Sequence, residues 1–324
     1  ELSLNSPLVS DFRMKKQGHT TKQAEVIPLA AIGQLRTEAE CRDVRGVFAS
    51  LMLVIAGGCI RFKHVQRSQL VEVTEDLLIF RCFMGKRRQQ GTREAFRWAS
   101  PRCWAPGHDT TRGAVELIRE VESKAPGYAK APFLVPDVLT TQGTAMGPGD
   151  RWTPRPMGYE KFVAIMRTCL MGYPGIQETK SFTFNTLRRL MPTGADVLQF
   201  NDTIAAAIGN WQELPGGRGD RKGRVKNQMA KRYAGEKIYT AGRYKLMVVV
   251  AINRSELAVG GASWNAVREQ DPGKKQLGQE MRAYRSEIRA EGGTGDMCTS
   301  TVTQGALKRW KPEPDRHIPP MNEL

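Results

Sequence analysis

The stretch that decides the fold is residues 181–233, SFTFNTLRRLMPTGADVLQFNDTIAAAIGNWQELPGGRGDRKGRVKNQMAKRY. Its first part predicts a helix after a short extended approach. Leu187, Leu190, Met191 and Gly194 recur there with the spacing of one buried helical face. A second helix is expected to follow over residues 201–208, so the stretch predicts two consecutive helices and then a basic loop.

Polar residues mark the ends of these two helices. Asn185 or Thr183 is a candidate cap for the first helix, and Asn201 or Asp202 is one for the second. Gly209 is expected to close the second helix in a left-handed conformation.

Two pairs of polar residues are held by this scaffold. Arg188 and Arg189 lie on the first helix, and Asn210 and Trp211 follow the second. A guanidinium group carries a planar fork of donors that matches two phosphate oxygens, so adjacent arginines suggest an oxyanion clamp. Taken alone, the pair fits solvated surface arginines better.

The charge balance indicates the class of partner. The 324 residues include 49 Lys and Arg against 33 Asp and Glu, which gives a net charge of +16. Such a surplus attracts a polyanion, with nucleic acid the first expectation and an anionic membrane surface the second.

The cysteines and the apolar runs indicate which metal, disulfide and membrane features to expect. Six cysteines with no C-x-x-C pair, and only four histidines, predict neither a metal site nor a disulfide framework. An intracellular, reducing compartment fits this usage. The chain starts at Glu1 without a signal peptide, which fits a fragment or a processed chain. The longest apolar run, residues 47–60, is shorter than the ~20 residues that span a bilayer, so we expect a core helix and no membrane partner.

Along the chain, further segments have helical or loop patterns. We expect helices over residues 24–36, 41–57, 110–123 and 159–171, a long connection over 130–156, an apolar helix or strand over 246–252, and a polar tail from 260 that contains a charged helix over 274–291.

An arginine directly follows the most apolar helix. Arg61 ends the run Gly57-Gly58-Cys59-Ile60-Arg61, with His64 and Arg67 beyond. A charge leaving a core helix either reaches out to water or holds an anion, and a single observation favours water.

Two strands with a cationic connection come next. Residues 77–84 and 94–98 predict a hairpin around the loop from Gly85 to Gly91. Charges at a hairpin tip are usually solvated, and this tip contains Lys86, Arg87 and Arg88.

The order of these motifs resembles the tyrosine recombinase/integrase family. The segment 57–61 is similar to that family's G-x-R-x-x-E motif with His64 at the acidic position, and Arg67 is a second candidate for the same arginine. Residues 185–189 resemble H-x-L-R-R and residues 208–211 resemble L-G-H or L-G-W, with asparagine at both histidine positions. A tyrosine, Tyr233, follows. The longer spacing before it resembles Crypton-type transposon recombinases, and the likeness covers residues 24–245.

The resemblance implies a fold and a domain plan. The fold is mainly α with a small antiparallel β-sheet (α+β), as in the catalytic domain of DNA breaking-rejoining enzymes. Residues 1–22 form an amino-terminal arm or linker, 23–259 the catalytic domain, and 260–324 the tail. The catalytic residues implied are Arg61, Lys86, Asn185, Arg188, Asn210 and Tyr233.

The resemblance also implies a mechanism without metal or cofactor. Arg61 and Arg188 clamp the phosphate, Tyr233 attacks phosphorus to form a phosphotyrosine, and Lys86 protonates the leaving oxygen. Asparagine can hydrogen-bond a phosphate but cannot exchange a proton at neutral pH. Tyr239 is the rival nucleophile.

The implied partner is double-stranded DNA, bound by a homo-oligomer during DNA recombination or integration by a transposable element. The location is the nucleus in a eukaryote and otherwise the cytoplasm. An inactive DNA-binding protein of the same fold and an unrelated RNA-binding protein are the alternatives. The additional DNA-binding candidates are Arg87, Arg88, Arg189, Trp211, Arg218, Arg221, Lys222, Arg224, Lys231 and Arg232.

Overall fold

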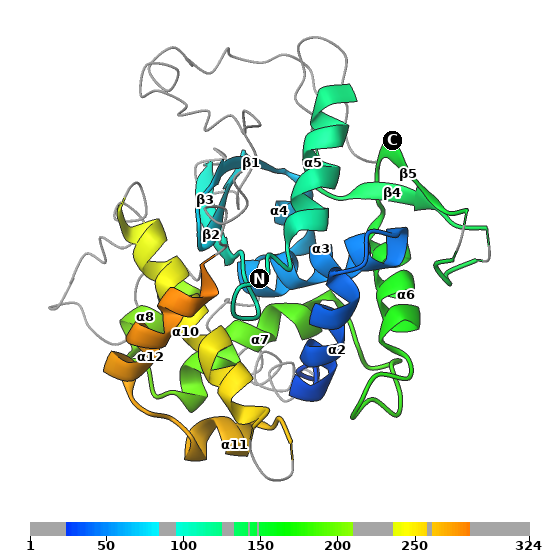
Figure 1. Ribbon diagram of the computed structural model, residues 1–324. Helices are drawn as coiled ribbons and strands as arrows, with labels where there is room; N and C mark the ends of the chain where they lie inside the picture. Colours follow the sequence, from blue (N-terminus) through cyan, green and yellow to red (C-terminus); the bar gives the residue numbers. More distant parts are fainter. Residues whose placement is uncertain are drawn as a thin grey trace, which may run out of the picture. The chain divides into compact units, whose positions relative to one another are not determined.

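The computed structural model describes residues 24–83, 95–124, 133–141, 143–147, 149–209, 236–257 and 261–285. A three-stranded antiparallel sheet packs against helices α3 and α10 (Figure 1). The helices are α2 (Leu29–Ala39), α3 (Val44–Gly58), α4 (Phe62–Gln66), α5 (Arg112–Lys124), α6 (Tyr159–Leu170), α7 (Phe184–Val197), α8 (Asp202–Ile208), α10 (Glu236–Ser255), α11 (Trp264–Glu269), α12 (Lys274–Glu280) and the 3-10 helix η1 (Met281–Tyr284). The strands are β1 (Ser68–Val73), β2 (Leu77–Cys82), β3 (Phe96–Pro101), β4 (Pro136–Leu139) and β5 (Arg151–Pro156).

Helix α3 is the centre of the core. Every residue from Phe48 to Ile60 is buried, which explains why this segment is apolar all round instead of showing one apolar stripe. Asp43 caps its first turn by accepting a hydrogen bond from the backbone N–H of Gly46 at 2.7 Å. Helices α2, α5 and α7 and strand β3 all contact α3. The predicted core helix is therefore confirmed.

Strands β1, β2 and β3 form an antiparallel sheet in that order. The predicted hairpin is confirmed as β2 and β3, which pair from Leu77↔Pro101 to Cys82↔Phe96. Strand β2 is apolar at consecutive positions because both of its faces are covered. Phe80 packs in the main core, whereas Ile79 packs with Ile238 of α10. Strand β1 was not predicted, since its alternation is broken by a bulge.

A second, two-stranded sheet corrects the expected long connection over residues 130–156. Strands β4 and β5 pair antiparallel there. Gln66 fixes the base of this pair, because its side-chain amide donates to the carbonyls of Val135 and Met157 at 3.0 and 2.7 Å. The many prolines and glycines concealed the strands, and β5 alone contains two prolines.

Helices α7 and α8 correspond to the two helices predicted from the opening stretch. Thr183, one of the two proposed caps, forms a capping box with Thr186 at the start of α7. Asn201 caps α8 by accepting from the N–H of Ile204 at 2.9 Å. The expectation of a left-handed Gly209 was wrong, since its φ of −72° is right-handed.

The chain from Gly261 to Arg285 corrects the expectation of a loosely ordered tail. The short helices α11, α12 and η1 pack against α10. Val267, Leu277 and Tyr284 are buried by this packing. The described part of this region therefore belongs to the folded body. Apolar residues spaced along a short polar segment were enough to anchor it.

The described residues form neither a membrane-spanning helix nor a metal-binding cluster. No helix in those ranges has the length and apolar character needed to cross a membrane. The same ranges contain no group of three or more His, Cys, Asp or Glu residues arranged to hold a metal ion.

Candidate functional site

The carboxyl end of α3 positions the candidate site. Cys59 ends the helix with a left-handed φ of 57°, and its own N–H donates to the carbonyl of Ile55 at 3.2 Å. Ile60 is still buried, whereas Arg61 is exposed at the N-cap of α4. The left-handed turn therefore brings the chain out of the core, and Arg61 is the first residue at the surface.

Arg188 of α7 lies at the same helix end. Its Nε donates to the carbonyl oxygen of Cys59 at 3.0 Å. Burial lowers the pKa of the half-buried Arg188, and the nearby charge of Arg61 lowers it further. Two arginines from distant parts of the sequence thus lie close enough to repel each other.

His64 lies one helical turn after Arg61. Burial lowers its pKa from 6.5 to about 4, and the charges of Arg61, Lys63, Arg67 and Arg188 act in the same direction. The imidazole is therefore neutral at physiological pH.

Lys245 of α10 is a fully buried cation behind this surface. It is 1% exposed, and its Nζ donates to the carbonyls of Ala99 at 2.8 Å and Gly58 at 3.3 Å. Burial lowers its pKa, and interaction with the Cys59 thiol opposes that shift. Lys245 thus ties α10 to β3 and to the end of α3.

We call Arg61, Lys63, Arg67 and Arg188 the cationic cluster, and the buried Lys245 lies behind it. Within the described ranges, no carboxylate lies within ion-pair distance of Arg61, Arg188 or Lys245, although many other basic side chains are paired. Buried or partly buried cations without a counter-ion favour an anionic ligand. The cluster is therefore suited to bind a phosphate.

Two other predicted residues, Asn185 and Arg189, lie on α7. Asn185 is exposed and lies one turn before Arg188, so both occupy one face of the helix. Arg189 is half-buried, and its guanidinium donates to the carbonyl of Ala24. The structure brings Arg61 and Arg188 together and directs Arg189 toward the amino-terminal segment.

Tyr239, the rival nucleophile, is occupied by another interaction. Its hydroxyl donates to Glu72 Oε2 at 2.6 Å. Burial and this carboxylate raise the pKa of Tyr239 to about 12. A phenol held in this way is a poor nucleophile near neutrality.

The remaining predicted residues lie outside the described residues. They are Lys86, Arg87, Arg88, Asn210, Trp211, Arg218, Arg221, Lys222, Arg224, Lys231, Arg232 and Tyr233. Cys82 pairs with Phe96 across β2 and β3, and the Phe96 ring lies edge-on to His64 with centroids 5.4 Å apart. The start of β3 therefore lies beside His64.

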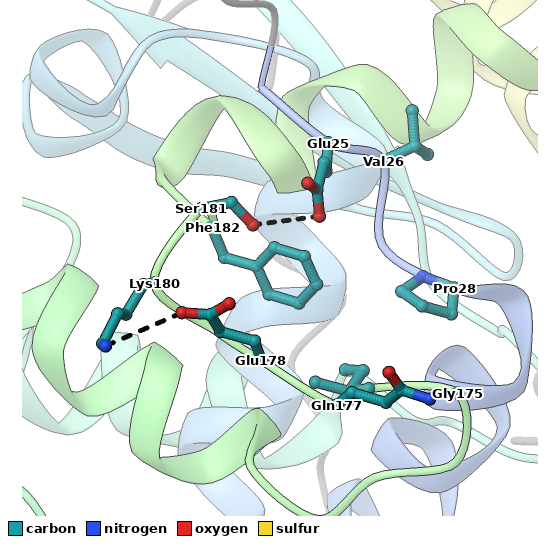
Figure 2. A pocket seen from close by; sticks show the side chains of 10 residues that line it. Glu25, Val26, Pro28, Gly175, Gln177, Glu178, Lys180, Ser181 and Phe182 are labelled. Atoms are coloured by element: carbon teal, nitrogen blue, oxygen red, sulfur yellow. Dashed lines mark hydrogen bonds and ion pairs between the residues drawn. The ribbon is translucent and has the colours of Figure 1, made fainter.

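A cavity of about 550 Å³ lies at a different place, between the segment before α2 and the loop before α7 (Figure 2). Two carboxylates, Glu25 and Glu178, line it. Glu25 accepts a hydrogen bond from Ser181 at 2.9 Å, and Glu178 pairs with Lys180 at 3.8 Å. These carboxylates make the cavity unsuited to a phosphate.

His64 and Lys245 are the site residues that the sequence did not reveal. His64 was noticed only as a departure from an acidic position. Lys245 continues the buried stripe formed by Ile238, Ala241 and Val249 at helical spacing. A lysine that continues an apolar helical stripe predicts a buried charge.

Comparisons of the chain with protein-family models, with curated proteins and with solved structures find no match.

Proposed function

We propose that this protein cleaves and rejoins strands of double-stranded DNA through a covalent phosphotyrosine intermediate. The observation that carries the proposal is the meeting of Arg61 and Arg188 at the end of α3, with no described carboxylate to neutralise them. The net charge of +16 supports DNA as the source of the phosphate.

The geometry of the cluster suits a phosphodiester under attack. Negative charge grows on the non-bridging oxygens in the transition state, and guanidinium groups fixed beforehand stabilise that charge more than the ground state. Arg188 is fixed by its bond to the Cys59 carbonyl, and the Arg61 backbone caps α4. Arg61 and Arg188 therefore form the proposed clamp.

The order of the elements supports a fold like the catalytic domain of tyrosine recombinases. The buried helix α3 leads to Arg61, then to α4, then to a three-stranded antiparallel sheet. Helix α7 follows later, with Asn185 and Arg188 on one face. In this proposal Lys86, on the β2–β3 connection, protonates the leaving oxygen, and Tyr233 is the nucleophile.

The biological reaction proposed is DNA recombination or integration by a mobile element, carried out by a homo-oligomer on DNA. A second candidate is a DNA-binding protein of the same fold that does not cut. Asn185 favours it, since an exposed amide one turn from Arg188 cannot exchange a proton at neutral pH.

The test is a covalent-trapping assay. Nicked duplexes made from the DNA that flanks the gene are incubated with the protein, and a protein–DNA adduct is sought on a denaturing gel. We expect an adduct that disappears with Tyr233→Phe and persists with Tyr239→Phe.

Two further results discriminate between the candidates. Tight DNA binding without any adduct supports the non-cutting protein. Loss of the adduct in Arg188→Gln but not in Arg268→Gln supports the clamp, because Arg268 is an exposed arginine on α11. An adduct that survives Tyr233→Phe refutes the assigned nucleophile.

A further inference from the structure

Strands β4 and β5 pair with each other apart from the three-stranded sheet (Figure 1). We call residues 136–139 and 151–156 the ribbon. Its strand β5 exposes two arginines, Arg151 and Arg155. Among the described residues, neither guanidinium group has a hydrogen-bond or ion-pair partner, so both are available to an anionic ligand.

The base of the ribbon is fixed to helix α4. At the end of α4, Gln66 donates to the carbonyls of Val135 and Met157 and accepts from the N–H of Val135 at 3.0 Å. At its start, the ring of Phe62 lies edge-on to that of Tyr159, with centroids 5.6 Å apart. The cationic cluster residues 61, 63 and 67 also lie on α4 or at its caps. The ribbon therefore extends from the helix that carries most of the cluster.

The outer face of β5 is polar and basic. Trp152 is half-buried and packs against the main core. Successive side chains of a strand point to opposite faces, so Arg151 and Thr153 point away from that core. Arg155 lies beyond them on the same strand and is also exposed.

The carboxylates next to the ribbon are already engaged. Asp137 pairs with Lys161 at 2.8 Å. Asp150 accepts hydrogen bonds from two backbone N–H groups at 2.8 Å each. Glu160 lies in the first turn of α6, where the unpaired N–H groups of a helix stabilise a negative charge. The two arginines of β5 have no such local partner and remain open to an outside anion.

The spacing of the two arginines matches the width of a DNA groove. Four residues of a strand span at most about 13 Å at a rise of about 3.3 Å per residue. The major groove of B-DNA is about 12 Å wide and admits a two-stranded ribbon. Arg151 and Arg155 can therefore reach phosphates on the two sides of one groove.

We infer, resting on the proposed function, that the ribbon is a second contact with duplex DNA, in which Arg151 and Arg155 bind backbone phosphates beyond the one held by the cationic cluster. A guanidinium group binds two phosphate oxygens through its planar fork of donors. Contacts of this kind position a protein on the duplex without reading its sequence. The ribbon thus lengthens the DNA site and fixes how the cluster lies on the backbone.

The salt dependence of DNA affinity tests the contact. Arg151→Gln/Arg155→Gln should reduce the slope of log affinity against log salt by about 1.8, which is about 0.9 for each phosphate contact. The matched control is Arg268→Gln/Arg282→Gln, which removes the same charge from exposed positions on α11 and η1 and should leave the slope unchanged. Arg151→Lys/Arg155→Lys should keep most of the slope, because lysine still neutralises a phosphate.

A series of progressively shorter duplexes locates the contact. When the duplex no longer reaches the ribbon, the slope for the unaltered protein should fall to that of Arg151→Gln/Arg155→Gln. That variant should show no change at the same length, since it lacks the contact. An equal loss in both proteins at every length overturns the inference.

The outcomes separate the two proposals. If the unaltered protein has no salt-dependent affinity for duplex DNA, the proposed function fails and this inference fails with it. If the protein binds duplex DNA but forms no adduct, strand cleavage fails and the ribbon contact stands on the slopes.

Two results refute the ribbon contact alone. One is a slope for Arg151→Gln/Arg155→Gln that falls no further than that of the control. The other is a slope that falls with single-stranded RNA and not with duplex DNA. A urea unfolding curve shows whether the double variant keeps its fold. If it does not, the two single variants decide, each with an expected fall of about 0.9 in the slope.

Discussion

Gly58→Ala tests whether close packing at the end of α3 supports the site. A Cβ atom at Gly58 would lie 2.6 Å from the Cζ3 atom and 2.9 Å from the Cε3 atom of Trp98. The indole cannot easily retreat, because it stacks on Phe80 with centroids 4.1 Å apart and its Nε1 donates to Ser68 at 2.8 Å. The added methyl group must therefore displace the helix end.

The magnitude follows from two opposing effects. Restoring a normal carbon–carbon separation requires a shift of about 1 Å, and overpacking of this kind costs about 1–3 kcal/mol. Alanine gains up to about 1 kcal/mol over glycine inside a helix and less at the last helical residue. We expect the free energy of unfolding to fall by about 1–2 kcal/mol. DNA affinity should also fall, since Cys59, whose carbonyl binds Arg188, is the next residue.

Urea unfolding followed by tryptophan fluorescence measures the change, with a lower midpoint and an unchanged slope expected. Gly278→Ala on α12 is the matched control. Its Cβ would meet only the methyl carbon of Met247, at an ordinary 3.5 Å, so we expect a gain of about 0.5–1 kcal/mol. Equal effects of the two substitutions, or a Gly58→Ala protein as stable as the original, would refute the packing argument.

Three other substitutions examine the charges. Arg61→Gln should reduce the slope of log affinity for duplex DNA against log salt by about 0.9, the value for one phosphate contact, while Arg268→Gln leaves the slope unchanged. Lys245→Met should leave the protein at least as stable at pH 7, because burial lowers the lysine pKa and its charge opposes folding below pH 10.5. Marked unfolding of this variant contradicts the account. Tyr239→Phe should lower the free energy of unfolding by about 1 kcal/mol, because the hydrogen bond to Glu72 is lost. Adduct formation should be unaffected. Loss of the adduct in this variant argues for Tyr239 as the nucleophile.

Helices with a clear apolar period were predictable from the sequence. Residues 159–171 correspond to α6, which ends at Leu170, and residues 110–123 correspond closely to α5. Strand β1 and the β4–β5 pair were missed because neither alternates cleanly, as a bulge interrupts each pairing. Local periodicity cannot report pairing of this kind, since the partner strand sets the register.

The candidate site also contains residues that were predictable from the sequence and residues that were not. Arg61 and Arg188 were predicted through the resemblance to a family's motifs, and the structure adds that Arg188 bonds the Cys59 carbonyl, two residues before Arg61. Lys245 could not be assigned to this place from the sequence, since its position depends on how α10 crosses β3 and the end of α3. The pattern of one segment cannot predict packing between segments that are distant in the sequence.

The cationic cluster itself argues that the protein has an anionic ligand. Burial lowers the pKa of Arg188 and of Lys245, so each is harder to protonate in the folded protein than in the unfolded chain. Neutral pH lies below the unfolded-chain pKa of both groups, so burying these two charges lowers the free energy of unfolding of the free protein there. An anion bound to the folded state alone offsets that cost and adds its own binding free energy. Binding of an anion explains a cluster that weakens the fold and attracts phosphate better than a role in stabilising the fold does.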